Sequence, residues 1–312
     1  MKPLTDNKII LVVRRTRLDE LVARFNTRDQ ARFYLEHLGA DFSDYELEDG
    51  TYKAAVQAAR SALSRLGRLQ VVDRQFIPNF IFGPCDTVVA LGQDGLVANV
   101  LKYLDGQPVV GVNPDPERWE GVLLPFTVAD LDLVLPDVFA RRRDLKAVTM
   151  AEARLNTGET LLGVNDLFIG PRSHTSARYE IEIGGRRETH SSSGIIVSTG
   201  LGSTGWLRSV LAGAAGIASS LSGRSLKIKE RHDFAWDARY LYFSVREPWP
   251  STTSAAGITF GKVTPRAPLR VLSQMPENGV VFSDGIEADF LQFNSGTQAT
   301  IGIARRQGQL VA

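Results

Sequence analysis

The chain has 312 residues, of which 43% are hydrophobic and 23% are charged. These shares are typical of soluble globular proteins, and they exclude a disordered chain, a collagen-like fibre and a coiled coil. Because 36 Lys and Arg stand against 35 Asp and Glu, the net charge is +1, and it indicates neither nucleic acid nor a membrane as a partner.

The single cysteine, Cys85, excludes an internal disulfide and favours a reducing compartment. It stands just before an apolar run, so we expect a buried, unreactive thiol. The longest early apolar run, residues 9–13, is far shorter than the ~20 residues of a membrane-spanning helix. We therefore expect a cytoplasmic protein.

Strand-like and helix-like segments alternate in the first third of the chain. Nearly continuous apolar runs, typical of buried parallel strands, occur at residues 8–13, 69–72, 87–91 and 108–112. Helices are predicted after the capping-box sequence 27–30, over residues 52–66 with a stop at Gly67, and over residues 96–104. This alternation predicts an α/β domain with a parallel sheet at residues 1–122.

The pattern changes after about Phe126. One more helix is predicted over residues 128–141, and period-two alternation then dominates. Apolar residues alternate with glutamates over residues 179–183, and Gly184-Gly185 predicts a hairpin turn. We therefore expect a β-rich domain at residues 123–312, built as an antiparallel β-sandwich.

The first motif is Gly92-Gln93-Asp94-Gly95, between a predicted buried strand and a predicted helix. Glycines let a ligand approach the backbone, and a helix N-terminus attracts phosphate. A carboxylate beside phosphates needs a role, such as accepting a proton from an attacking hydroxyl. An Asp-Gly turn that caps the helix is the alternative, and the motif alone favours that alternative.

The second motif, residues 195–206, contains G-x-G-x-x-G with glycines at 200, 202 and 205. A dinucleotide-binding fingerprint needs a surrounding βαβ unit. Here a hairpin precedes the motif and we expect strands after it, which argues against that fingerprint. The Ser and Thr hydroxyls of the loop still suit a phosphate or a ribose, and a flexible connector is the alternative.

The third motif is Asn165-Asp166 within an apolar segment, where an amide and a carboxylate can bind a base edge and ribose hydroxyls. A simple turn is an equal alternative. Residues 282–285 predict a hairpin turn. The four histidines, His37, His174, His190 and His232, form no metal-spaced pair, so no metal site is expected.

Taken in order, these motifs resemble those of the NAD kinase family, which carries a Gly-Gly-Asp-Gly loop, an Asn-Glu or Asn-Asp pair and a Gly-Ser-Thr-rich segment. The chain looks closest to the mitochondrial-type NAD kinases. The stretches that suggest this branch are Thr16-Arg17 and residues 111–118, 192–194 and 243–248. The resemblance runs from about residue 8 to about residue 303.

The resemblance implies transfer of the γ-phosphoryl group of ATP to the 2′-hydroxyl of the adenosine ribose of NAD. It makes Asp94 the proton acceptor. The residues it places at the ATP phosphates are Gly92, Gln93 and Gly95. The residues it places at NAD are Asn165, Asp166, Ser193, Thr199, Ser203, Thr204 and Trp206. Mg²⁺ would arrive with ATP, and we expect a homodimer or a larger homo-oligomer.

Gln93 departs from the family pattern, because a glycine usually stands there. If the position needs a positive φ, glutamine costs about 1 kcal/mol or more. Two other functions stay open, the first because lipid kinases have a similar Gly-Gly-Asp-Gly loop and the second because of Gln93. One is a related kinase with a lipid or sugar acceptor, and the other is a nucleotide-binding sensor without catalysis.

Overall fold

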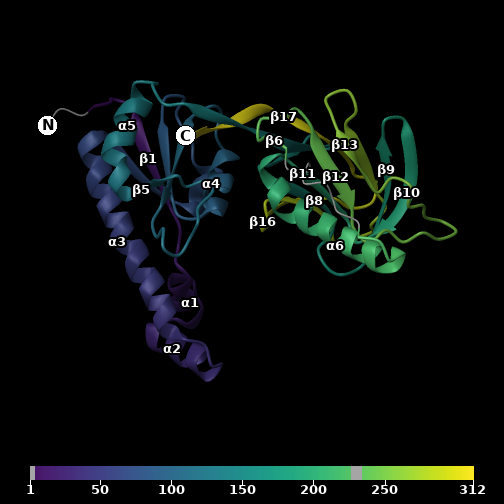
Figure 1. Ribbon diagram of the computed structural model, residues 1–312, viewed down its shortest axis with the longest axis horizontal. Coiled ribbons are helices and arrows are strands. Elements are labelled where there is room, and N and C mark those ends of the chain that lie inside the picture. The colour runs from purple at the N-terminus through teal and green to yellow at the C-terminus, as the bar shows by residue number, and fades with distance from the viewer. Residues whose placement is uncertain (1–3, 226–233) are drawn as a thin grey trace. The chain divides into compact units, whose positions relative to one another are not determined.

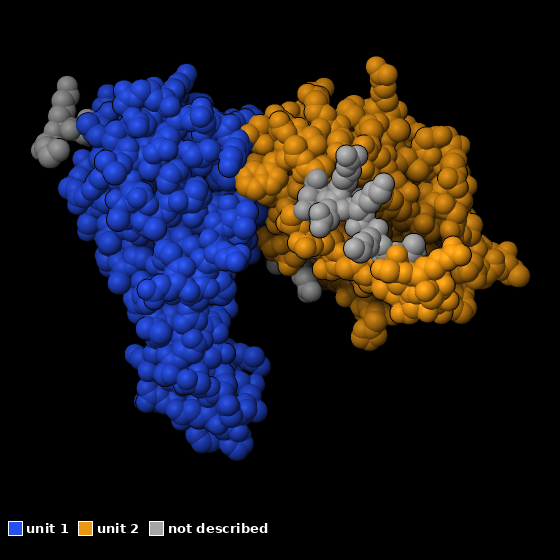
Figure 2. All heavy atoms as spheres, viewed as in Figure 1, with its two compact units in different colours: residues 1–146, 308–312 blue, residues 147–307 orange. Residues whose placement is uncertain are grey.

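The structure is a computed structural model that describes residues 4–225 and 234–312. It divides into two compact units, residues 1–146 with 308–312 and residues 147–307 (Figure 2). The boundary thus lies later than the expected position after residue 122, and the last five residues return to the first unit. The reason is that β5 (Phe126–Thr127) pairs with the first unit's sheet and α5 (Leu131–Phe139) packs against its longest helix.

The first unit contains a parallel sheet, as the sequence predicted, and its strand order is β4-β3-β1-β2. Figure 1 shows β1 within this unit. Its strands are β1 (Lys8–Val13), β2 (Arg68–Asp73), β3 (Thr87–Leu91) and β4 (Pro108–Asn113). The end of β17 (Gln298–Val311) adds a further parallel strand beside β4. Every residue of β3 is buried, which explains why its sequence is a continuous apolar run.

Helices follow the strands of this unit. They are α1 (Arg17–Phe25), α2 (Arg28–His37), α3 (Phe42–Leu66), α4 (Asp94–Leu101) and α5. Thr27 caps α2 by accepting a hydrogen bond from the Gln30 amide, and α3 ends at Gly67, both as predicted. However, α3 begins at Phe42, ten residues before the predicted start, because Asp41 caps it. Short 3₁₀ turns lie at Arg74–Asn79 and Val128–Asp130.

The second unit contains two antiparallel sheets. One has the order β13-β12-β11-β8-β15-β16, and the other contains β10-β9-β14-β17 together with β6 and β7. The strands are β6 (Leu145–Leu155), β7 (Thr160–Gly163), β8 (Asp166–Pro171), β9 (Ala177–Ile183), β10 (Arg186–Ser192), β11 (Ile195–Ser198), β12 (Leu241–Val245), β13 (Phe260–Val263), β14 (Leu269–Ser273), β15 (Gly279–Ser283) and β16 (Ile286–Gln292).

One apolar core joins the inner faces of these two sheets. It contains Tyr179 and Val271 from one sheet and Val197 and Phe243 from the other, all fully buried or nearly so. Two packed antiparallel sheets of this kind form a β-sandwich, as the sequence predicted. The predicted hairpin turn at Gly184-Gly185 is also present, with φ of 56° and 79°.

Two local expectations are wrong. We expected strands after the glycine-rich segment, yet a 3₁₀ turn (Leu201–Thr204) and then the 17-residue helix α6 (Trp206–Ser222) follow it. Small residues dominate α6, so large apolar side chains do not mark its helical period. Cys85 is exposed rather than buried, because it lies in the turn before β3 and not in the strand itself.

Candidate functional site

The Gly92–Gly95 loop follows the central buried strand β3 and leads directly into α4. Gln93 is the N-cap of α4, with φ of −109° and ψ of 164°. This is extended backbone that any residue adopts, so the glutamine introduces no strain. A Cβ atom at Gly92 would lie 2.9 Å from the Leu96 Cδ2 atom, at the end of a flexible side chain. Gly95 is open, with nothing within 4 Å of a Cβ atom.

The Asp94 carboxylate holds a neighbouring loop. Its Oδ1 accepts a hydrogen bond of 2.8 Å from the Leu123 amide, and its Oδ2 accepts one of 3.2 Å from the Val122 amide. A carboxylate has about four lone-pair sites, so these two bonds leave acceptor capacity on both oxygens. The side chain is half-buried. Asp94 is therefore both a structural tie and an accessible acceptor at the N-terminus of α4.

In the second unit, Asp284 anchors the segment that contains the Asn165-Asp166 pair. It occupies the turn between β15 and β16, where φ is 55°. Its carboxylate accepts hydrogen bonds from the amides of Val164 (3.1 Å), Asn165 (2.6 Å) and Asp166 (3.3 Å). The predicted turn at residues 282–285 is confirmed, but its carboxylate was missed as part of the site. No local signal identifies it, because its partners lie about 120 residues earlier in the chain.

The Asp166 carboxyl group is buried without a hydrogen-bonding partner among the described residues. Its side chain belongs to a residue that is 8% exposed, and burial together with the negative charge of Asp284 raises its pKa to about 7. The side-chain amide of Asn165 is half-buried and also has no hydrogen-bonding partner among the described residues, since only the backbone amide of Asn165 donates to Asp284. The two side chains thus offer unused hydrogen-bonding capacity in a low-dielectric place.

The hydroxyl groups of the glycine-rich loop are used inside the protein. The Thr199 hydroxyl donates to the Val164 carbonyl (2.5 Å) and accepts from the Gly202 amide (3.2 Å). The Ser203 hydroxyl donates to the Gly200 carbonyl (2.7 Å). Both side chains are buried. Contact of Thr199 and Ser203 with NAD stays a prediction, and these hydrogen bonds give both side chains a structural role in positioning the loop against the Asn165-Asp166 segment.

Two of the three glycines of the G-x-G-x-x-G sequence, Gly200 and Gly202, serve backbone packing. A Cβ atom would lie 2.0 Å from the Asn165 carbonyl oxygen at Gly202 and 2.1 Å from the Ala235 carbonyl oxygen at Gly200. The preceding strand, β11, pairs antiparallel with both β8 and β12. The surroundings are therefore not the parallel βαβ unit of a dinucleotide-binding fingerprint, as the sequence analysis concluded.

Ser193 and Trp206 line a common cavity of about 350 Å³ in the second unit. The Trp206 ring stacks on Phe168, with centroids 5.8 Å apart, and the Arg246 guanidinium lies 5.5 Å from the Trp206 ring centroid. Thr204 is exposed in the preceding turn. An aromatic wall beside a cation suits a planar ring joined to an anionic group.

These second-unit residues share one region of one sheet. Asp166 pairs in register with Ser198, the last residue of β11 before the glycine-rich loop. Asp166 and Phe168 are two residues apart on β8, so their side chains lie on the same face. Asp166 and the aromatic cavity are therefore neighbours on this face. The Gly92–Gly95 loop belongs to the first unit.

Neither a metal cluster nor a membrane helix is found in the part of the chain that the structure describes. No group of three His, Cys, Asp or Glu residues there is arranged to hold a metal ion, and His232 lies outside this part. Likewise, no helix within residues 4–225 and 234–312 is long and apolar enough to cross a membrane.

Two solved structures are similar to this chain. One is an NAD kinase from Archaeoglobus fulgidus in complex with ATP, with a TM-score of 0.59 and 16% identity over 98% of this chain and 93% of that one. The other is yeast NADH kinase complexed with NADH, with a TM-score of 0.57 and 16% identity over 99% of this chain and 84% of that one. No family model and no curated protein sequence matches. On the backbone alone, the chain has the fold of the NAD kinases.

Proposed function

We propose that the protein is an NAD kinase that transfers the γ-phosphoryl group of ATP to the 2′-hydroxyl of the adenosine ribose of NAD. The observation that carries the proposal is the buried Asp166 carboxyl group, which has no partner among the described residues and stands beside the half-buried Asn165 amide. In a stable fold, a buried polar group without a partner is costly. A bound ligand with adjacent hydroxyls would provide the missing partners.

Ribose hydroxyls match this arrangement chemically. They donate to a carboxylate, and such bonds favour the ionised form of Asp166 over the protonated one. Hydrogen bonds to a charged group contribute roughly 1.5–3 kcal/mol each. The Asn165 amide can donate to and accept from a base edge or a ribose. Trp206 and Arg246 would bind the remaining ring and an anionic group of the dinucleotide in the neighbouring cavity.

The Gly92–Gly95 loop would bind the ATP phosphates. Its backbone lies at the N-terminus of α4, where amide groups and the helix dipole favour anions. The remaining acceptor capacity of Asp94 suits removal of the hydroxyl proton as the new bond to phosphorus forms. Mg²⁺ would be held by the phosphate oxygens of ATP, since no metal cage exists among the described residues.

Three finer assignments rest on the sequence. We propose that the protein belongs to the mitochondrial-type branch, on the motifs at residues 111–118, 192–194 and 243–248. We also propose that it forms a homodimer or a larger homo-oligomer in the cytoplasm. Light scattering of the purified protein tests the oligomeric state.

The decisive experiment is NADP formation from NAD and ATP by the purified protein, with the Asp166→Ala variant alongside. The loss of a charge-assisted hydrogen bond predicts NAD binding weaker by about ten-fold or more. Calorimetry that shows unchanged NAD affinity in the variant would remove Asp166 from the site. Phosphorylation of a lipid or a sugar, but not of NAD, would show that the protein is a related kinase with another acceptor.

A nucleotide-binding sensor remains the second candidate. The observation that favours it is the double hydrogen bond of Asp94 to the Val122 and Leu123 amides, because a structural role alone would account for that carboxylate. A sensor binds NAD and ATP without forming NADP. The same preparation therefore distinguishes the two functions, since binding and turnover are measured side by side.

A further inference from the structure

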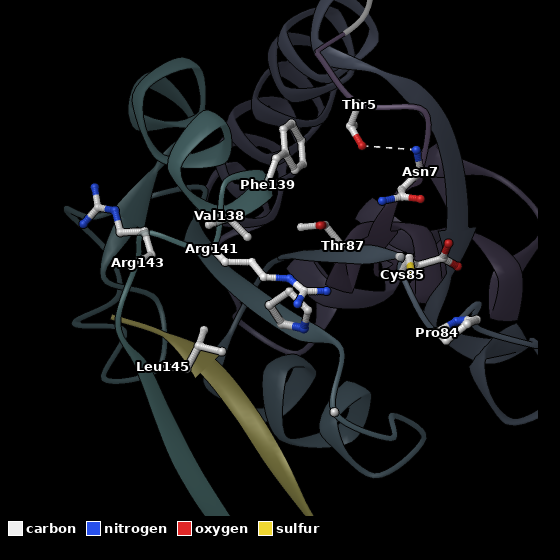
Figure 3. Close-up of a pocket in the computed structure, with 13 residues that line it drawn as sticks. Thr5, Asn7, Pro84, Cys85, Thr87, Val138, Phe139, Arg141, Arg143 and Leu145 are labelled. Carbon is white, nitrogen blue, oxygen red and sulfur yellow. Dashed lines mark hydrogen bonds between the residues drawn. The ribbon is translucent and has the colours of Figure 1, made fainter.

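A second cavity, of about 430 Å³, lies in the first unit (Figure 3). It lies at the N-terminal ends of the parallel strands, whereas the Gly92–Gly95 loop follows the C-terminal end of β3. Its walls include residues at the N-terminal ends of three strands, namely Asn7 just before β1, Thr87 at the start of β3 and Pro108 at the start of β4. The Gly92–Gly95 loop follows the other end of β3, and a five-residue strand separates the two places by about 15 Å. The proposed kinase chemistry therefore does not use this cavity.

Arg141 enters the cavity from an unfavourable backbone conformation. It follows α5 in a Schellman motif, in which the Arg142 amide donates to the Asp137 carbonyl (2.8 Å) and the Arg141 amide donates to the Val138 carbonyl (3.0 Å). Arg141 has a φ of 54°, the left-handed conformation for which glycine is preferred. An arginine at this position introduces strain that a glycine would avoid.

The guanidinium group of Arg141 carries a charge that no described residue neutralises. Figure 3 shows its side chain extending into the cavity toward Thr87. The next residue differs, because Arg142 forms an ion pair with Asp137 at 2.6 Å. Arg143 also lines the cavity, with its guanidinium group above the Phe126 ring, and its buried Nε atom has no hydrogen-bonding partner among the described residues.

Thr87 adds an independent sign of a missing ligand. It is only 6% exposed, and its hydroxyl has no hydrogen-bonding partner in the described parts of the chain. Figure 3 shows this hydroxyl at the centre of the cavity. The acidic group in the wall, Asp86, is already engaged by the Gly83 amide (2.7 Å) and lies 4.0 Å from the Lys8 ammonium group. The cavity therefore presents the solvent-exposed Arg141 guanidinium group, which has no acidic partner among the described residues, and an unused hydroxyl donor.

We propose that this cavity binds a small organic anion, with its phosphate or carboxylate group held by the Arg141 guanidinium and the Thr87 hydroxyl. Guanidinium groups match the planar or tetrahedral oxygens of both anions. The apolar body of the ligand packs against Val138, Phe139 and Leu145, which line the same space. This is a second ligand site, separate from that of the proposed kinase reaction.

Cys85 provides the test, because this exposed thiol lines the cavity and is the only cysteine of the chain. We would measure the rate at which neutral N-ethylmaleimide labels the full-length protein, with phenyl phosphate, benzoate or neutral benzyl alcohol present. A ligand at ten times its Kd should slow labelling about ten-fold. For each variant, the labelling rate without ligand is divided by the rate with ligand, so that differences in thiol reactivity between variants cancel.

The matched variants are Arg141→Gly and Arg142→Gln. We expect Arg141→Gly to lose the protection, yet to raise Tm, because glycine relieves the left-handed backbone. Arg142→Gln should keep the protection, because Arg142 does not line the cavity. Protection by phenyl phosphate alone assigns a phosphate ester, and protection by benzoate alone assigns a carboxylate. Absence of protection by both anions, equal protection by benzyl alcohol, or full protection in Arg141→Gly would overturn the proposal.

Discussion

Replacement of the buried acid Asp166 by asparagine should make the free protein more stable at pH 8. The carboxyl group has a pKa of about 7 in the folded chain against an ordinary value of 3.8. The folded protein therefore keeps a proton that the unfolded chain has released, and the free energy of unfolding falls as the pH rises from about 4 to about 7. At 1.36 kcal/mol per pH unit, the difference of about three pH units corresponds to about 4 kcal/mol.

Asparagine has nearly the same shape and no charge, so Asp166→Asn removes this destabilisation. The variant should exceed the wild type in stability by up to about 4 kcal/mol at pH 8 and should nearly equal it at pH 4. Urea unfolding followed by tryptophan fluorescence measures both differences. Because wild type and variant are compared at each pH, the titration of groups that do not interact with Asp166 cancels. The same variant should bind NAD more weakly, since it loses the charged acceptor.

Asp284 is the matched control, because it is a neighbouring acid whose carboxylate has hydrogen-bonding partners. Its carboxylate accepts from three backbone amides, whereas that of Asp166 accepts from no described residue. At pH 5, where Asp166 is protonated, Asp284→Asn should lower stability by about 1–3 kcal/mol. A wild-type stability that does not fall between pH 5 and pH 8 relative to Asp166→Asn would refute the reasoning. So would an Asp166→Asn variant that is less stable than wild type at pH 8.

Three further predictions concern the two glycine-containing loops. Asp94→Asn should reduce NADP formation by ~10²–10⁴-fold through loss of the base, while NAD affinity should change little. The same variant should have a free energy of unfolding lower by about 1 kcal/mol, because one of the two hydrogen bonds from the Val122 and Leu123 amides is lost. Gln93→Gly should leave turnover within a few-fold, because φ is already −109°, and a large gain in turnover would contradict this. Gly202→Ala should destabilise the protein strongly in thermal unfolding, since its Cβ atom would lie 2.0 Å from a carbonyl oxygen, whereas Gly95→Ala should fold normally.

Several features were predictable because their causes lie within a few residues along the chain. Thr27 caps α2 through an amide three positions away, and Gly67 ends α3 through the Leu63 carbonyl. The Gly184-Gly185 turn needs only two residues that accept a positive φ. The buried strand β3 and the loop after it were likewise visible as an apolar run followed by glycines. Local backbone chemistry is sufficient for such features, so the fold class follows from them.

The details of the site needed the tertiary structure, because their causes lie far apart in the chain. Asp284 holds the Asn165-Asp166 segment across about 120 residues, and Gly202 is a glycine because the Asn165 carbonyl packs against it. The sequence suggests the Thr199 hydroxyl as a ligand contact, and only the tertiary structure shows that it also donates a hydrogen bond to the Val164 carbonyl.

The order of the strands and helices along the chain, and the residue types that carry the chemistry, were predictable from the linear pattern. Which of those polar groups have hydrogen-bonding partners, and which have none, became known only from the folded arrangement. Asp166 and Thr199 show the difference, since both are buried polar residues, yet only the Thr199 side chain has a hydrogen-bonding partner among the described residues. Hydrogen-bond satisfaction depends on contacts between distant segments, and a linear pattern does not record those contacts.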